Sequence, residues 1–140
     1  MKEKDMTAYF MRVDKEQGIP YRGYAGTIED SLAALQRYVN FDEPGGWIQA
    51  VALGDGILVL CHDEGKLLGF PANRAWLDDE GRVADVFAGN IMAVRHTGEE
   101  FSGILASDIP YVEKHLRPVI LGDGGCVQIP EEELPEYRKG

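Results

Sequence analysis

The polar residues best suited to hold a ligand lie in the stretch 62–74. Asn73 and Arg74 follow a proline-fixed corner, from which an amide and a guanidinium can bind an anion together. His62 and Lys66, in the stretch just before this corner, contribute an imidazole and an ammonium group. The predicted ligand-binding residues are therefore His62, Lys66, Asn73 and Arg74. The structural alternative is that Asn73 bonds to the backbone of its own turn, while Arg74 pairs with a neighbouring carboxylate such as Asp85.

Other types of chemical site lack the residue spacing that they require. The thiols and imidazoles that zinc prefers belong to Cys61, His62, His96, His115 and Cys126. No two of these residues stand at the short C-x-x-C or H-x-x-x-H spacings of zinc sites. The Gly-Asp-Gly run at 54–56 joins two strands and forms no phosphate loop, and residues 78–81 lack the alternating ligands of a calcium loop. Ser102, Ser107 and Cys61 lie in no nucleophile motif. We therefore predict no catalytic residue, no metal and no cofactor, and leave open an enzyme whose groups converge only in space.

The chain is strongly acidic. Its formal net charge is −10 at pH 7, from 24 acidic and 14 basic residues. This charge argues against direct nucleic-acid binding, which depends on neutralising phosphates. It suits solubility, and it also suits docking onto a basic surface of another protein. The acidic residues predicted to make such contacts lie in two turns: Asp78, Asp79, Glu80, Glu99 and Glu100.

Length and composition predict one folded domain in the cytosol. With 140 residues, of which 44% are hydrophobic, the chain is long enough for one core and too short for two ordinary ones. We expect a disordered N-terminus at 1–6, a single domain at 7–129 and a flexible acidic tail at 130–140. The N-terminus lacks the apolar core of a signal peptide, and no apolar run approaches the roughly 20 residues that span a membrane. The two cysteines are therefore expected to be free.

Two local patterns define the main elements that must position the polar residues. Asp55 and Gly56, which both tolerate positive φ, separate apolar runs at 47–53 and 57–61, and this predicts a β-hairpin. Both runs carry apolar groups on both faces, which predicts strands covered on both sides. Residues 27–40 are predicted to form the main helix, with Thr27 as its cap. The apolar stripe of this helix has spacings of 4, 3 and 4, at Ile28, Leu32, Leu35 and Val39.

The remaining elements are shorter. Residues 66–70 are predicted to return as a third strand, followed by a polar corner at 71–74. A second helix is expected from Ser107 or Asp108 to about Arg117, where Pro118 stops it. Residues 121–124 repeat the Leu-Gly-Asp-Gly turn of the hairpin. Together these patterns predict an α+β fold: a mixed, mainly antiparallel sheet of about five to seven strands, with one main helix packed on a face and a second short helix.

Several motifs recur in an order that is typical of one protein family. They are the string EGKLLGFPANRA at 64–75, the paired glycines before Trp47, and Asp85 followed by Ala88-Gly89. In this order they resemble the domain-of-unknown-function family DUF3846, over about residues 7–116. The resemblance implies a context on conjugative elements and phages of gut bacteria, and it brings no established catalytic residues. The chain departs from the family pattern in a longer loop at 40–44 and in an extension at 118–140.

Two functions follow from these expectations. The leading hypothesis is a non-enzymatic acidic binding or inhibitor protein of a phage or mobile element, which blocks a host-defence nuclease through an acidic surface. Its partner would be a host protein with a basic surface, and it would contact neither nucleic acid nor membrane directly. The alternative is a small-ligand binding module for a nucleotide or another phosphate-bearing molecule, built around residues 62–74.

Overall fold

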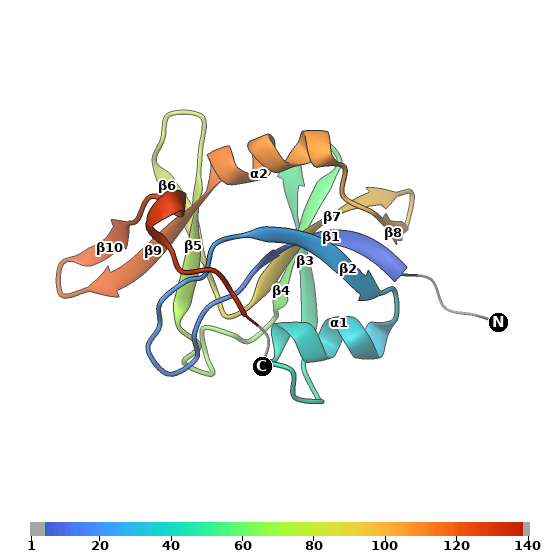
Figure 1. The fold of residues 1–140 in the computed structure, drawn as a ribbon, viewed down its shortest axis with the longest axis horizontal. Coiled ribbons are helices and arrows are strands. Elements are labelled where there is room, and N and C mark those ends of the chain that lie inside the picture. Colours follow the sequence, from blue (N-terminus) through green and yellow to red (C-terminus); the bar gives the residue numbers. More distant parts are fainter. Residues whose placement is uncertain (1–4, 139–140) are drawn as a thin grey trace.

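The computed structural model describes residues 5–138, which form strands in two sheets and two α-helices (Figure 1). Two short 3-10 helices, η1 (Ala106–Asp108) and η2 (Glu131–Glu133), complete the regular elements. The α-helices are α1 (Leu32–Val39) and α2 (Ile109–His115). The strands are β1 (Asp5–Met11), β2 (Tyr24–Glu29), β3 (Ile48–Gly54), β4 (Ile57–His62), β5 (Ala72–Leu77), β6 (Val83–Ala88), β7 (Ile91–Thr97), β8 (Glu100–Ser102), β9 (Leu116–Gly122) and β10 (Gly125–Gln128).

The strands pair in two antiparallel sheets. The first sheet has the order β2-β1-β7-β4-β3, with β8 as a sixth strand paired to β7. The second sheet has four strands, in the order β10-β9-β5-β6. The α+β class is therefore confirmed, and the six strands of the first sheet agree with the expected number. The second sheet was not foreseen, because it joins β5 to β9, which are far apart in the sequence.

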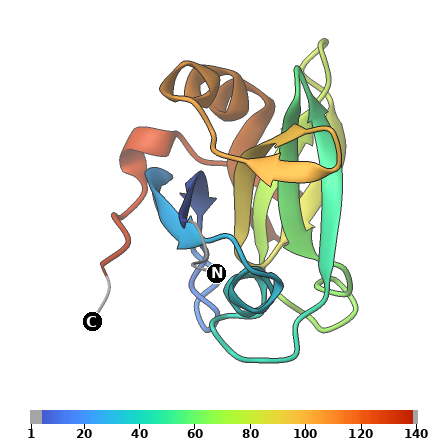
Figure 2. The ribbon, with the colours of Figure 1, turned by 90° about the vertical axis from the view of Figure 1, so that its right-hand side faces the viewer.

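The central strands β1, β7 and β4 separate two hydrophobic clusters. Even-numbered residues of these strands, such as Phe10, Leu60 and Met92, pack against α1 through Leu35 and Tyr38. Odd-numbered residues face the second sheet and α2; they include Tyr9, Met11, Val59, Cys61, Ile91 and Ala93. The core therefore has two layers, one on each face of the first sheet, because side chains alternate along a strand. Figure 2 shows α1 and α2 at opposite ends of the molecule.

The predicted hairpin is present as β3 and β4. Asp55 and Gly56 form its turn with φ of 57° and 81°, the positive values that these residue types tolerate. The expectation that both strands are covered on both faces holds for β4, which lies between β3 and β7. For β3 the expectation is wrong. This strand is at the end of the sheet, and its Gln49, Ala50 and Ala52 are exposed.

The main helix begins later than predicted. Thr27 and Ile28 belong to β2, where they pair with β1, and α1 starts only at Leu32. Ser31 is the cap, because its backbone is extended and its Oγ accepts a hydrogen bond from Ala34 N at 3.2 Å. The β-branched residues therefore extend the sheet rather than the helix, as their stiff side chains favour.

Three other boundaries also differ from expectation. Residues 66–70 form a turn closed by hydrogen bonds from Leu68 N to Glu64 O and from Phe70 N to Gly65 O, both 2.9 Å, so the predicted third strand is wrong. The predicted polar corner at 71–74 is largely the start of β5. The second helix ends at His115, before the predicted Arg117, because the chain turns there into β9. The Leu-Gly-Asp-Gly repeat at 121–124 does form a hairpin, between β9 and β10.

The two ends of the described chain contact the domain. Asp5 and Met6 belong to β1, whereas residues 1–4 of the predicted disordered N-terminus lie outside the described residues. In the predicted flexible tail, Leu134 is buried and Tyr137 packs on Tyr21 and Tyr24; residues 139–140 lie outside the described chain. Neither α-helix within residues 5–138 is long and apolar enough to cross a bilayer.

Candidate functional site

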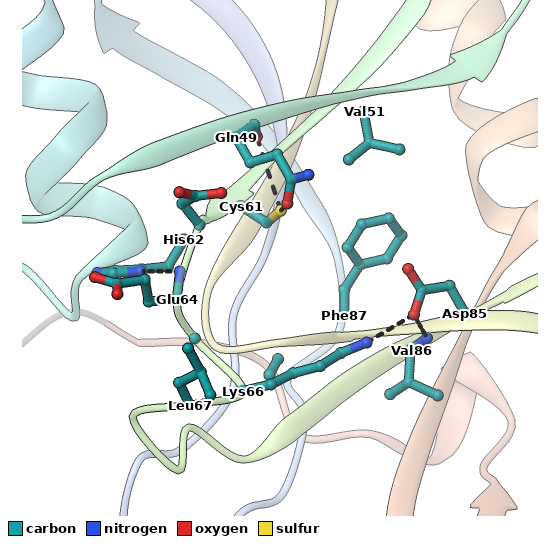
Figure 3. Close-up of a pocket in the computed structure, with 13 residues that line it drawn as sticks. Gln49, Val51, Cys61, His62, Glu64, Lys66, Leu67, Asp85, Val86 and Phe87 are labelled. Atoms are coloured by element: carbon teal, nitrogen blue, oxygen red, sulfur yellow. Dashed lines mark hydrogen bonds and ion pairs between the residues drawn. The ribbon is translucent and has the colours of Figure 1, made fainter.

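A cavity of about 270 Å³ lies between the β3–β4 hairpin and β6 (Figure 3). We call it the edge pocket; it is lined by Gln49, Val51, residues 61–67 and residues 85–88. The hairpin supplies one wall, β6 supplies the other, and the turn after β4 closes one end. Figure 3 shows Gln49 and Val51 projecting from the same side of β3, toward Cys61 and Phe87. The pocket therefore has an apolar middle and polar groups at its ends.

An ion pair connects the turn after β4 to the β6 wall of the edge pocket. Lys66 Nζ lies 2.7 Å from Asp85 Oδ1, and Asp85 also accepts a hydrogen bond from Val86 N at 2.8 Å. Partial burial acts to raise the pKa of Asp85, but the hydrogen bonds from Lys66 and Val86 outweigh it and hold this pKa below its ordinary value. Both side chains are largely exposed, so the pair contributes little to stability. Its charges remain open to a ligand or a partner.

Cys61 and His62, two residues of the pocket lining, are engaged in structural contacts. Burial, together with the nearby carboxylates of Asp63 and Asp85, raises the pKa of the Cys61 thiol to about 11. Since the thiolate is the nucleophile, this shift disfavours the reactive form of Cys61 at neutral pH. His62 Nδ1 accepts a hydrogen bond from Glu64 N at 2.9 Å, and its ring packs edge-on against Phe70. These contacts hold the turn that closes the pocket.

The structure separates the predicted ligand-binding residues into two groups. His62 and Lys66 line the edge pocket, whereas Asn73 and Arg74 are fully buried elsewhere. Asn73 Nδ2 donates to Met11 O at 2.7 Å and to Gly89 O at 2.8 Å, and thus connects β5 to β1 and to the β6–β7 link. It bonds to backbone, as the structural alternative held, but to distant strands rather than to its own turn.

Arg74 has a different partner from the one suggested by the sequence. Asp85 pairs with Lys66, and the carboxylate that faces Arg74 belongs to Glu131, 3.4 Å from Arg74 Nη2. Arg74 also donates to Asn73 Oδ1 at 2.7 Å and to Tyr21 O at 3.0 Å, while its Nε has no hydrogen-bond partner among the described residues. The guanidinium therefore joins the C-terminal segment to the core.

The acidic residues predicted to contact a partner occupy two separate turns. Asp78, Asp79 and Glu80 are exposed in the β5–β6 turn, and Glu99 and Glu100 are exposed at the β7–β8 turn. Figures 1 and 2 place both turns at the same end of the molecule as α2. Part of this charge is used locally, because Asp78 Oδ1 accepts hydrogen bonds from the backbone of Glu80 and Arg82, and Glu80 pairs with Arg82.

Sequence reasoning missed the open edge of β3 beside the pocket. Within residues 5–138, no strand pairs with the outer side of β3, which lies at the end of its sheet (Figure 2). Between Gly45 and Gly54 the chain has no charged residue and no proline. Such residues protect most natural sheet edges from pairing with another chain, so their absence marks this segment as an unprotected strand. Two large apolar side chains are also exposed beside this edge and its pocket: Trp47, which directly precedes β3, by 64%, and Leu67, which lines the pocket, by 85%.

The cysteines and the metal-ligand types do not gather. Cys61 and Cys126 are both free, and Cys126 is exposed on β10 rather than buried as a strand cysteine usually is. Within residues 5–138, no three His, Cys, Asp or Glu side chains form a group that could hold a metal ion.

Comparison with known protein families gives one match. The model of a domain of unknown function, DUF3846, matches residues 6–117. The chain belongs to this family. Comparisons with curated proteins and with solved structures gave no match. The DUF3846 match confirms the resemblance of the string at 64–75, and it includes the whole edge pocket. Glu131, the partner of Arg74, lies outside the matched residues.

Proposed function

We propose that this DUF3846 protein is a non-enzymatic binding protein that receives an extended segment of another protein along the outer edge of β3. The observation that supports it is a strand edge with free backbone groups, next to a pocket that can select a side chain. In this mode of recognition, backbone hydrogen bonds provide affinity and pockets for alternate side chains provide specificity.

The backbone of β3 presents its free groups at even-numbered residues. Trp47 O accepts a hydrogen bond from Asp63 N on the β4 side at 2.8 Å, so odd-numbered residues bond inward. Because hydrogen-bonded and non-bonded pairs alternate in an antiparallel ladder, Ile48, Ala50 and Ala52 direct their N–H and C=O groups outward. A register shift between Ala52 and Gly54 ends the regular edge. The docking edge is therefore 48–52.

The edge pocket supplies the selectivity. Gln49 and Val51 line it, so alternate side chains of an added strand lie on the pocket side. The lining contains three carboxylates, those of Asp63, Glu64 and Asp85, against the single ammonium of Lys66. This balance favours a lysine or arginine of the partner. A cavity of about 270 Å³ is also small for a separate ligand, since such sites typically measure about 300–1,000 Å³.

The partner class follows from charge. A net charge of −10 attracts a protein with a basic surface, and the pocket adds a local preference for a basic side chain. A host-defence nuclease, whose nucleic-acid groove is basic, is the partner that this charge and the mobile-element context favour. Electrostatic attraction of this kind weakens as the salt concentration rises. The acidic turns at 78–80 and 99–100 then contribute to the rate of encounter rather than to the docking edge.

The test uses peptides selected from a random library on the immobilised protein. Selected peptides should contain a lysine or arginine within an extended segment, and should shift the amide NMR signals of residues 48–52. Ala50→Pro removes one outward N–H and no bond to β4, so it should abolish binding while the domain stays folded. Ala50→Thr keeps that N–H and is the matched control. Selected peptides that bind Ala50→Pro as well as the unchanged protein would refute the proposal.

A further inference from the structure

A second, larger hollow lies on the opposite face of the first sheet, between β2 and α1. Its volume is about 530 Å³. We call it the aromatic groove; its main lining residues are Phe10, Arg12, Tyr24, Arg37, Tyr38 and Tyr137. Phe10 of β1 and Tyr24, Gly26 and Ile28 of β2 line it, whereas the edge pocket uses Gln49 and Val51 of β3 and Cys61 and His62 of β4. The groove is therefore independent of the proposed peptide edge.

Four aromatic rings line the groove, those of Phe10, Tyr24, Tyr38 and Tyr137. The rings of Tyr24 and Tyr137 are nearly parallel, at 3°, with centroids 5.9 Å apart. Phe10 packs against Tyr24 at 5.3 Å and against Tyr38 at 5.2 Å. Tyr137 comes from the C-terminal segment, so this segment completes one wall. Such a set of ring faces can stack on a flat aromatic ligand.

Two guanidinium groups lie among these rings. Arg12 Cζ is 4.8 Å from the centroid of Tyr38 and 4.3 Å from that of Tyr137, and its Nε donates to Tyr24 Oη at 2.9 Å. Arg37, in the last turn of α1, is exposed and makes no ion pair with any residue of the described chain. The one carboxylate of the lining, on Asp42, lies 3.4 Å from Arg12 Nη1. The groove is therefore locally positive in a chain of net charge −10.

We propose that the aromatic groove binds a nucleoside phosphate. The base stacks on the Tyr24 and Tyr137 rings, and the phosphate is held by Arg37 together with Arg12, which exchanges Asp42 for the ligand. Guanidinium groups form paired, charge-assisted hydrogen bonds with phosphate oxygens. The volume of about 530 Å³ suits a small ligand, and the mainly apolar lining with a few polar groups is typical of such sites.

The ligand is a mononucleotide rather than a nucleic acid. A long polyanion would meet the negative charge of the whole chain, whereas a mononucleotide contacts only the locally positive groove. This assigns the phosphate-binding role, which the sequence suggested for Asn73 and Arg74, to different residues on another face.

The test is an NMR titration of the full chain with ATP, followed at backbone amides and arginine side-chain N–H groups. ATP should shift the signals of Thr27, Arg37 and Tyr137, and should bind more tightly than adenosine or inorganic phosphate alone. Arg37→Gln should weaken ATP binding roughly tenfold or more, as expected for the loss of a charge-assisted hydrogen bond. Tyr137→Ala should also weaken it, while Tyr137→Phe, which keeps the ring, should not.

The control variant is Arg82→Gln, which removes an exposed guanidinium from the distant β5–β6 turn. It should leave ATP binding unchanged, and the amide spectrum of each variant reports whether the domain is folded. The proposal is overturned if about 5 mM ATP shifts no groove signal, since even millimolar affinity would then be absent. It is equally overturned if Arg37→Gln and Tyr137→Ala weaken binding no more than Arg82→Gln does. If a proline-rich peptide shifts the groove signals and ATP does not, the groove binds a peptide and the nucleotide proposal is overturned.

Discussion

The Glu131→Gln substitution should lower the free energy of unfolding by about 2 kcal/mol. Arg74 is fully buried, and burial lowers its pKa, which means that its charge is costly to hold in the core. The carboxylate of Glu131 offsets this cost, with both oxygens 3.4 Å from Arg74 Nη2. Removing one partner of a buried ion pair typically costs about 3–5 kcal/mol. The side chain of Glu131 is 19% exposed, and a glutamine oxygen can still accept from Gly23 N, so we expect the smaller loss.

Urea denaturation measures this loss, and an unchanged m-value would show that the unfolding transition is the same. Glu132→Gln is the matched control, because Glu132 is the next residue, is exposed, and contributes only its backbone carbonyl to a hydrogen bond with Arg22. A double-mutant cycle with Arg74→Met should give a coupling of about 1–3 kcal/mol. If Glu131→Gln and Glu132→Gln differ by less than about 0.5 kcal/mol, the guanidinium is stabilised without Glu131 and the reasoning is wrong.

Three further predictions concern local contacts. The hydrogen bonds from Arg95 hold the pKa of Asp108 below its ordinary value near 3.8, so the stabilisation is present above about pH 4 and is lost as the pH falls below it. Asp108→Asn should therefore reduce the dependence of stability on pH between about 2 and 5; an unchanged dependence in urea titrations would contradict this. Ser31→Ala should cost about 1 kcal/mol through the lost helix cap, whereas Ser31→Asp should not. Asp55→Val should cost about 1–2 kcal/mol because φ is 57°, and Asp55→Gly, measured alongside, should be tolerated.

Local turn chemistry was readable from the sequence, and long-range pairing was not. The Asp55-Gly56 turn depends on two adjacent residues whose φ values are positive, so its signal lies within the hairpin itself. Whether β3 is a central or an edge strand depends instead on β7, which pairs with β4 on the side away from β3. Apolar content on both faces of a strand does not reveal that order. The second sheet was missed for the same reason, since β9 joins β5 across about 40 residues.

The candidate site residues show the same difference between local signals, which the sequence reveals, and long-range contacts, which it does not. His62 and Lys66 both line the edge pocket, because His62 ends β4 and Lys66 lies in the turn that follows, so the two residues are close in sequence as well as in space. Arg74 follows a proline in a polar string, and that pattern suggests exposure. It is buried because Glu131, 57 residues later, supplies a carboxylate. The charged composition of 130–140 predicted a flexible tail, whereas the buried Leu134 and the packed Tyr137 show contacts that composition does not encode.

The alternation of side chains in the first sheet keeps the two proposed sites apart. Gln49, Val51 and Cys61 of β3 and β4 face the edge pocket, and Phe10 of β1 and Tyr24 of β2 face the aromatic groove, so Cys61 and Phe10 belong to different layers of the core. Between the layers lie the buried strands β1, β7 and β4, which are packed on both faces and leave little freedom for one site to move the other. Arg37→Gln should therefore leave peptide binding at β3 unchanged, and Ala50→Pro should leave nucleotide binding unchanged. Each variant thus serves as a control for the other site, and the two proposals can fail independently.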